Sequence, residues 1–233
     1  SSDLWKVFLL ITVPMIAPSL AAGAMTTDGV STLVTITLGA PHGVTAENLA
    51  AAAAEWQEQL AHFPAPRIAV LAGGNSASAT YELEDFHELG VLASEMANAA
   101  KGALMVTNSR RTGARATDYL RLALSAEHEF FAWSPDAPNP YHAFLGLAEA
   151  IIVTGDSMSM CAEACGTGKP VFIYVPRRGK LAPKLRAMHH SLFEAGLAQP
   201  LTANVNIYWK PAATLDEAGR VAAEIVRRRY TTK

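Results

Sequence analysis

Two short segments of this 233-residue sequence carry residue types that suit the binding of an anion. Gly73-Gly74-Asn75-Ser76 follows an apolar run, and its glycines would let backbone N–H groups approach a phosphate closely. Ser109-Arg110-Arg111 follows another apolar run and offers hydroxyl and guanidinium donors, which suit phosphate or carboxylate. The alternatives are a tight turn for the first segment and a solvated loop for the second.

A third segment begins with Asp156 after a glycine turn and predicts the start of a helix. Its first residues are Ser157, Met158, Ser159 and Met160. The first N–H groups of a helix have no partner within the helix, so this start is a candidate anion site. Glu163 follows nearly two turns later, where its carboxylate could accept from both hydroxyls of a ribose. The alternative is that Asp156 and Ser157 only cap the helix and that Glu163 is solvated.

Two side chains are candidates for a catalytic base. His42 follows a Gly-Ala-Pro turn after a strand-like run, and Asp156 opens the third segment. We expect no metal site, because Cys161 and Cys165 share a helical face without further soft ligands nearby. The sequence also lacks the HExxH and G-x-S-x-G motifs of metal-dependent hydrolases and serine esterases.

The elements that would position these residues follow from apolar periodicity. Strands are expected at Ile68–Ala72, Ala103–Thr107, Glu129–Trp133, Ala150–Thr154 and Val171–Val175. Helices are expected at Leu83–Lys101, Ala114–Leu124, Met158–Cys165, Leu181–Leu192 and Asp216–Arg229. This alternation predicts an α/β fold with a doubly wound, Rossmann-like parallel sheet. Such sheets bind ligands beyond the carboxyl ends of their strands, where all three segments fall.

The first 65 residues are expected to form a partial second α/β domain, separate from the Rossmann-like domain of residues 66–233. Val30–Leu38 predicts a strand and Ala46–Ala61 an amphipathic helix, and a proline-containing break follows at His62–Pro66. Leu4–Val13 is interpreted as a buried strand that runs into a proline-rich loop. A secretory signal or a membrane span are the alternatives for this stretch.

Composition narrows the class of protein. Half of the residues are hydrophobic, and the mean hydropathy of +0.15 excludes a disordered chain. A net charge of −2 argues against a nucleic-acid-binding protein. Two cysteines four residues apart cannot form a disulfide framework, so we expect a reducing compartment, the cytoplasm. Membrane association is not indicated by the sequence, and the oligomeric state cannot be predicted from it.

Four motifs that occur in one order carry a resemblance to a known family. They are Gly73–Ser76, Thr107–Thr112, Asn139–Tyr141 and Val153–Pro170. Together they resemble the plant "elongated mitochondria" fission-factor family, whose bacterial members are often labelled predicted nucleoside-diphosphate-sugar epimerases. The wider resemblance is to GT-B glycosyltransferases and to UDP-N-acetylglucosamine 2-epimerases.

This resemblance implies a fold of the GT-B C-terminal-domain type and a nucleotide-sugar site. The diphosphate would lie against Gly73, Gly74 and Ser76 and against the helix start at Met158–Met160, with Arg110 or Arg111 offsetting its charge. The resemblance also implies that Glu163, seven residues before Pro170, binds the ribose.

Three functions follow from these observations. The first is a nucleotide diphosphate-sugar-binding enzyme that transfers or epimerises the sugar without metal or cofactor, using His42 or Asp156 as the base. The second is a non-catalytic interaction protein that keeps the fold and recruits a partner, as the plant members suggest. The third, a Rossmann oxidoreductase, is disfavoured because the sequence lacks G-x-G-x-x-G.

Overall fold

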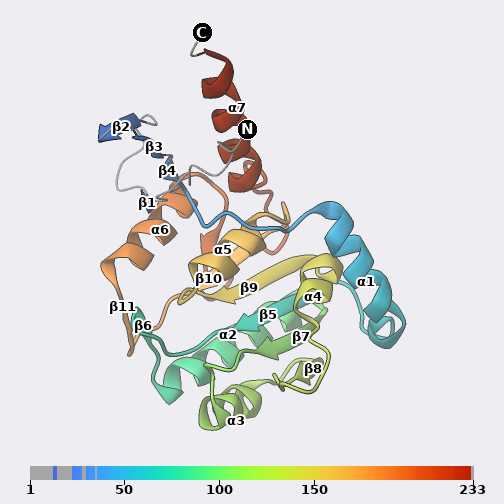
Figure 1. The fold of residues 1–233 in the computed structure, drawn as a ribbon. Helices are drawn as coiled ribbons and strands as arrows, with labels where there is room; N and C mark the ends of the chain where they lie inside the picture. Colours follow the sequence, from blue (N-terminus) through green and yellow to red (C-terminus); the bar gives the residue numbers. More distant parts are fainter. Residues whose placement is uncertain (1–12, 15–22, 28–29, 35, 232–233) are drawn as a thin grey trace.

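The structure is a computed structural model and describes residues 13–14, 23–27, 30–34 and 36–231 (Figure 1). Apart from Val13, the strand expected at Leu4–Val13 lies outside the described residues.

A six-stranded parallel sheet forms the centre of the molecule and confirms the predicted fold class. Its strands run in the spatial order β12 (Gln199–Pro200), β10 (Val171–Tyr174), β9 (Ala150–Thr154), β5 (Arg67–Ala72), β7 (Ala103–Asn108) and β8 (His128–Phe131). Chain order reverses between β5 and β9, which makes this pair the topological switch point of a doubly wound sheet. Strand β12 is not predicted from the sequence, because its two residues carry no alternating pattern.

Both faces of the sheet are covered, because successive residues of each strand point to opposite sides. Ile68 and Val70 of β5 pack beneath α2 (Leu83–Ala100) and α3 (Ala114–Ala123). Ala69 and Leu71 pack against the other layer of helices. That layer contains α1 (Ala46–Leu60), α4 (Tyr141–Leu147), α5 (Met158–Cys165) and α6 (Pro183–Glu194) (Figure 1).

The predicted helices agree with the structure to within two residues at most of their ends, including α7 (Glu217–Thr231). The seven-residue helix α4 was missed, because it is too short to show a periodic apolar stripe. The two-residue strands β6 (Ala79–Thr80) and β11 (Lys180–Leu181) were also missed, and they pair antiparallel at the carboxyl edge of the sheet.

Small strand pairs precede the main sheet. The predicted strand Val30–Leu38 is observed as β3 (Val30–Val34), which pairs with β2 (Gly23–Thr27), and as β4 (Ile36–Thr37), which pairs with β1 (Val13–Pro14). Helix α1 packs against α4 and buries Leu60 completely in the core beside the sheet. A domain boundary between residues 65 and 66 stays a prediction. In the part of the chain that the structure describes, no helix combines the length and apolarity needed to cross a bilayer.

Candidate functional site

Three loops meet at the carboxyl ends of β5, β7 and β9, and a buried carboxylate connects them. Asp156 follows β9, and its Oδ2 accepts hydrogen bonds from the Gly74 N–H at 3.1 Å and the Arg111 guanidinium at 2.7 Å. Beside it, the hydroxyl of Thr154 accepts from the Gly73 N–H at 2.6 Å. The side chain of Asp156 is fully buried, whereas that of Arg111 is one-third exposed. This arrangement fixes the three loops relative to one another.

The two glycines are required by close packing. A Cβ atom on Gly73 would clash with the carboxylate of Asp156, and one on Gly74 would clash with the carbonyl group of Arg111. The Thr112 hydroxyl also bonds the Gly73 carbonyl oxygen, at 2.5 Å. Both glycine N–H groups, expected from the sequence to face a phosphate, therefore donate within the protein.

Three further residues predicted as ligand-binding shape the turns of these loops. The side-chain oxygen of Asn75 accepts from the Tyr81 N–H at 2.6 Å. The hydroxyl of Ser76 accepts from the N–H two residues later at 3.2 Å, and that of Ser109 accepts from the Arg111 N–H at 3.2 Å. These contacts preorganise the backbone of the carboxyl edge.

Helix α5 begins at this edge with the predicted cap. The Ser157 hydroxyl accepts from the Met160 N–H at 3.3 Å. The N–H groups of Met158 and Ser159, the first two of the helix, have no acceptor within it. These two amides carry the partial positive charge of the helix start and could bind an anion.

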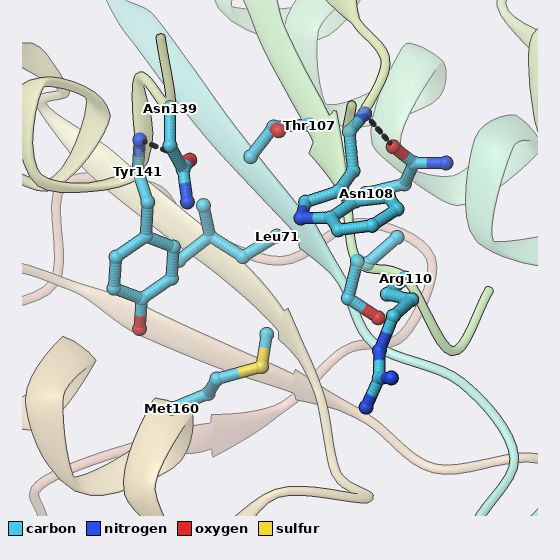
Figure 2. Close-up of a pocket in the computed structure, with 10 residues that line it drawn as sticks. Leu71, Thr107, Asn108, Arg110, Asn139, Tyr141 and Met160 are labelled. Atoms are coloured by element: carbon cyan, nitrogen blue, oxygen red, sulfur yellow. Dashed lines mark hydrogen bonds between the residues drawn. The ribbon is translucent and has the colours of Figure 1, made fainter. Parts of the chain in front are cut away.

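A pocket of about 200 Å³ lies beside the start of α5 and the ends of β5 and β7 (Figure 2). Leu71 and Met160 give it apolar walls, and Tyr141 and Trp133 add aromatic surface. Figure 2 shows Tyr141 and Asn139 on one side of the pocket and Arg110 on the other. Trp133 is 40% exposed, so part of its ring is accessible from solvent.

The side chains with free hydrogen-bonding groups in this pocket are donors. Among the described residues, the Arg110 guanidinium, the Trp133 indole N–H and the Asn139 amide nitrogen have no hydrogen-bond partner. The Asn139 side-chain oxygen accepts from the Tyr141 N–H at 3.0 Å, which leaves the amide nitrogen on the pocket side (Figure 2). The pocket is therefore suited to a ligand rich in acceptors, such as carbonyl or phosphate oxygens.

Glu163 does not itself line this pocket, but it contacts Tyr141, which does. The hydroxyl of Tyr141 donates to Glu163 Oε2 at 2.6 Å. Burial, followed by the negative charge of Glu163, raises the pKa of Tyr141, so its hydroxyl stays protonated and remains a donor at neutral pH. Sequence reasoning noted Tyr141 within a motif but missed this role, because α4, the helix that presents it, was not predicted.

The structure does not bring His42 to the carboxyl edge. The ring of His42 packs against Gly166, just after the far end of α5, and its Nε2 donates to the Leu215 carbonyl oxygen at 3.2 Å. Eight helical residues separate the two ends of α5, or roughly 12 Å at 1.5 Å per residue. His42 therefore supplies no base beside the Gly73 loop. Asp156 is at this edge, and its contacts give it a bracing role.

Three other titratable groups, in α6 and α5, are buried and uncharged at neutral pH. His189 of α6 is 2% exposed and lies against Gly155, and burial lowers its pKa to about 4. Burial raises the pKa of both cysteine thiols, Cys161 and Cys165. Within the described ranges, no three His, Cys, Asp or Glu side chains cluster as metal ligands.

Comparison with known sequences identifies relatives over most of the chain. The family model for Mitochondrial fission ELM1 matches residues 25–229. The Mitochondrial fission protein ELM1 of Arabidopsis thaliana is 28% identical over 207 residues, covering 86% of this chain and 47% of that protein. Uncharacterized protein RP120 of Rickettsia prowazekii is 28% identical over 204 residues, covering 81% of this chain and 53% of that protein. The chain thus spans about half the length of the curated relatives it matches.

A solved structure supports the fold. The crystal structure of a candidate UDP-N-acetylglucosamine 2-epimerase from Listeria monocytogenes aligns with a TM-score of 0.51 at 15% identity. The alignment covers 85% of this chain and 55% of that protein, and it confirms the GT-B-like architecture. With the family match over residues 25–229, these findings show that the chain belongs to the mitochondrial fission ELM1 family.

Proposed function

We propose that this chain binds a nucleoside diphosphate-sugar at the carboxyl edge of its sheet. The observation that carries this proposal is a carboxylate, Glu163, that accepts a hydrogen bond from Tyr141, a residue lining a pocket of free donors beside a helix start. In this arrangement the base occupies the pocket, Glu163 accepts from the ribose hydroxyls, and the diphosphate lies at the start of α5.

The pocket suits the base because of its size and its donors. Pockets for complete drug-sized ligands measure roughly 300–1,000 Å³, so a volume of about 200 Å³ accommodates only one part of a nucleotide-sugar. The Asn139 amide nitrogen and the Trp133 indole N–H would donate to carbonyl oxygens. We therefore expect uracil or guanine, which carry carbonyl groups, to be preferred over adenine.

The charges at the helix start suit a diphosphate. Asp156 would repel an anion, but its charge is offset by the guanidinium of Arg111 at 2.7 Å. Arg110 has no ion-pair partner among the described residues, and it lines the pocket. The amides of Met158 and Ser159 and the guanidinium of Arg110 would then contact the phosphates, while Arg111 keeps Asp156 neutralised.

The reaction that we propose for the bound ligand is glycosyl transfer or epimerisation of its sugar. The name of the Listeria monocytogenes protein, which includes UDP-N-acetylglucosamine 2-epimerase, supports this class by analogy of fold. Because this chain spans about half the length of its relatives, the reaction belongs to the proposal for the whole protein.

Calorimetric titration with UDP, GDP, ADP and CDP tests the site. We expect micromolar binding of UDP or GDP, and loss of a carboxylate hydrogen bond in Glu163→Gln should weaken it about tenfold or more. Glu95→Gln is the matched control, because Glu95 is exposed on α2 and away from the pocket. Absence of binding to all four nucleotides, or equal affinity in Glu163→Gln, would refute the proposal.

A further inference from the structure

We propose that Tyr141 is a positioning residue that makes the site selective for the two hydroxyls of a ribose. It acts through Glu163, whose carboxylate it holds in one orientation. This inference rests on the proposed nucleotide site and deepens it, because it states which part of the ligand is discriminated and by which pair of residues.

The contact itself defines which oxygen remains available. Tyr141 donates to Oε2 of Glu163 at 2.6 Å, a short hydrogen bond of the charge-assisted kind. No other hydrogen bond to this carboxylate is formed by the residues that the structure describes. Oε1 and the remaining lone pair of Oε2 are therefore free to accept from two adjacent hydroxyl groups.

Tyr141 is itself rigidly placed. It is the first residue of α4, and its N–H donates to the Asn139 side chain at 3.0 Å. The helix is anchored by Phe144 and Leu145, which are both fully buried in the core beside the sheet. The ring of Tyr141 packs against the same core and lines the pocket. The tyrosine therefore transmits the position of α4 to a side chain on α5.

An unheld glutamate would lose rotamer freedom each time it bound a ligand, which weakens binding. When Tyr141 already orients the carboxylate, this entropy is lost during folding and not during binding. Each ribose hydroxyl can then donate to an oxygen that is already in position. A nucleotide lacking one hydroxyl then leaves the acceptor without a partner, and such losses discriminate strongly between ligands.

The simpler alternative is that Tyr141 only links α4 to α5. The chain offers a matched control for that alternative. Tyr174 of β10 donates to Glu88 Oε2 of α2 at 3.0 Å, and neither residue lines the pocket. Tyr174→Phe removes the same chemical group and the same type of contact as Tyr141→Phe.

The experiment measures affinities for UDP, 2′-deoxy-UDP and 3′-deoxy-UDP, and for the same three forms of GDP, by calorimetry. In the wild-type chain, we expect each deoxy form to bind about tenfold more weakly than its parent. Tyr141→Phe should weaken binding of the parent nucleotide roughly three- to tenfold. It should also reduce the difference in affinity between the parent nucleotide and its deoxy forms. Tyr174→Phe should preserve the discrimination. In a Glu163→Ala background, Tyr141→Phe should have no further effect, because the group it positions is absent.

Each other outcome overturns a defined part of the reasoning. If wild type binds UDP or GDP but Tyr141→Phe leaves the ribo-to-deoxy ratio unchanged, the positioning role is wrong and the nucleotide site stands. If Tyr141→Phe and Tyr174→Phe weaken all ligands equally, the contact is only structural. If wild type binds no nucleotide, both the site and the inference are wrong.

Discussion

Replacement of Asp156 by alanine should destabilise the fold, because its carboxylate braces three loops. The substitution removes the acceptor for the Gly74 N–H and for the Arg111 guanidinium. Loss of one partner of a buried ion pair costs about 3–5 kcal/mol of unfolding free energy. The Arg111 side chain is 34% exposed and can turn toward water, so we expect the lower end, about 3 kcal/mol.

Thermal unfolding followed by circular dichroism measures this effect. For a chain of this size, about 3 kcal/mol corresponds to a fall in Tm of roughly 6–12 °C. Asp156→Asn keeps one acceptor oxygen and should give a smaller fall. Asp136→Ala is the control, because Asp136 is exposed and its carboxylate makes no hydrogen bond within the described residues.

The bracing role would be refuted if Asp156→Ala unfolded within about 2 °C of the Asp136→Ala control. A loss of nucleotide turnover without any loss of stability would instead favour the catalytic role considered from the sequence.

Three other perturbations test separate parts of the site. Gly74→Ala, whose added Cβ would meet the Arg111 backbone, should unfold at a lower urea concentration than wild type, whereas Gly43→Ala, with open space around it, should not. Ser157→Ala should cost about 1 kcal/mol of unfolding free energy through loss of its cap, measured by urea denaturation. The pKa of His189 is about 4 in the folded chain and about 6.5 in the unfolded chain. Between these pH values the unfolded chain binds more protons than the folded chain, so the free energy of unfolding should fall as the pH drops from about 6.5 to about 4. This fall, up to about 3 kcal/mol, should be absent in His189→Gln. It should be retained in the control variant His190→Gln, because His190 is exposed. Equal dependence of stability on pH in the two variants would contradict the role given to His189.

The fold was largely predictable because its strands are continuous apolar runs and its long helices are clearly amphipathic. Val171–Tyr174 and Ala150–Thr154 are fully buried, as expected for a parallel sheet covered on both faces. Helix α4 and strand β12 escaped prediction because seven and two residues cannot display a period. Helix α4 is defined by its packing against α1, and strand β12 by its pairing with β10.

The candidate site was predictable in location but not in its contacts. Strand ends placed Gly74, Arg111 and Asp156 at one edge, yet the hydrogen bonds of Gly74 and Arg111 to Asp156 depend on three-dimensional spacing that the sequence does not encode locally. The hydrogen bonds of Asp85 are a second example of contacts that the sequence does not predict. It is completely buried and accepts from the N–H groups of Arg177, Arg178 and Gly179, more than 90 residues away. In the sequence it appears only as an acidic residue in the first turn of a helix.

Nuclear magnetic resonance of the ¹⁵N-labelled chain, titrated with UDP and with GDP, tests the proposed nucleotide site most directly. We expect the largest shift changes at the Met158 and Ser159 amides, the Asn139 side-chain amide and the Trp133 indole N–H. The same titration of Glu163→Gln should require about tenfold more nucleotide to reach half-saturation. No shift changes at saturating nucleotide, or changes confined to residues away from the carboxyl edge, would contradict the account.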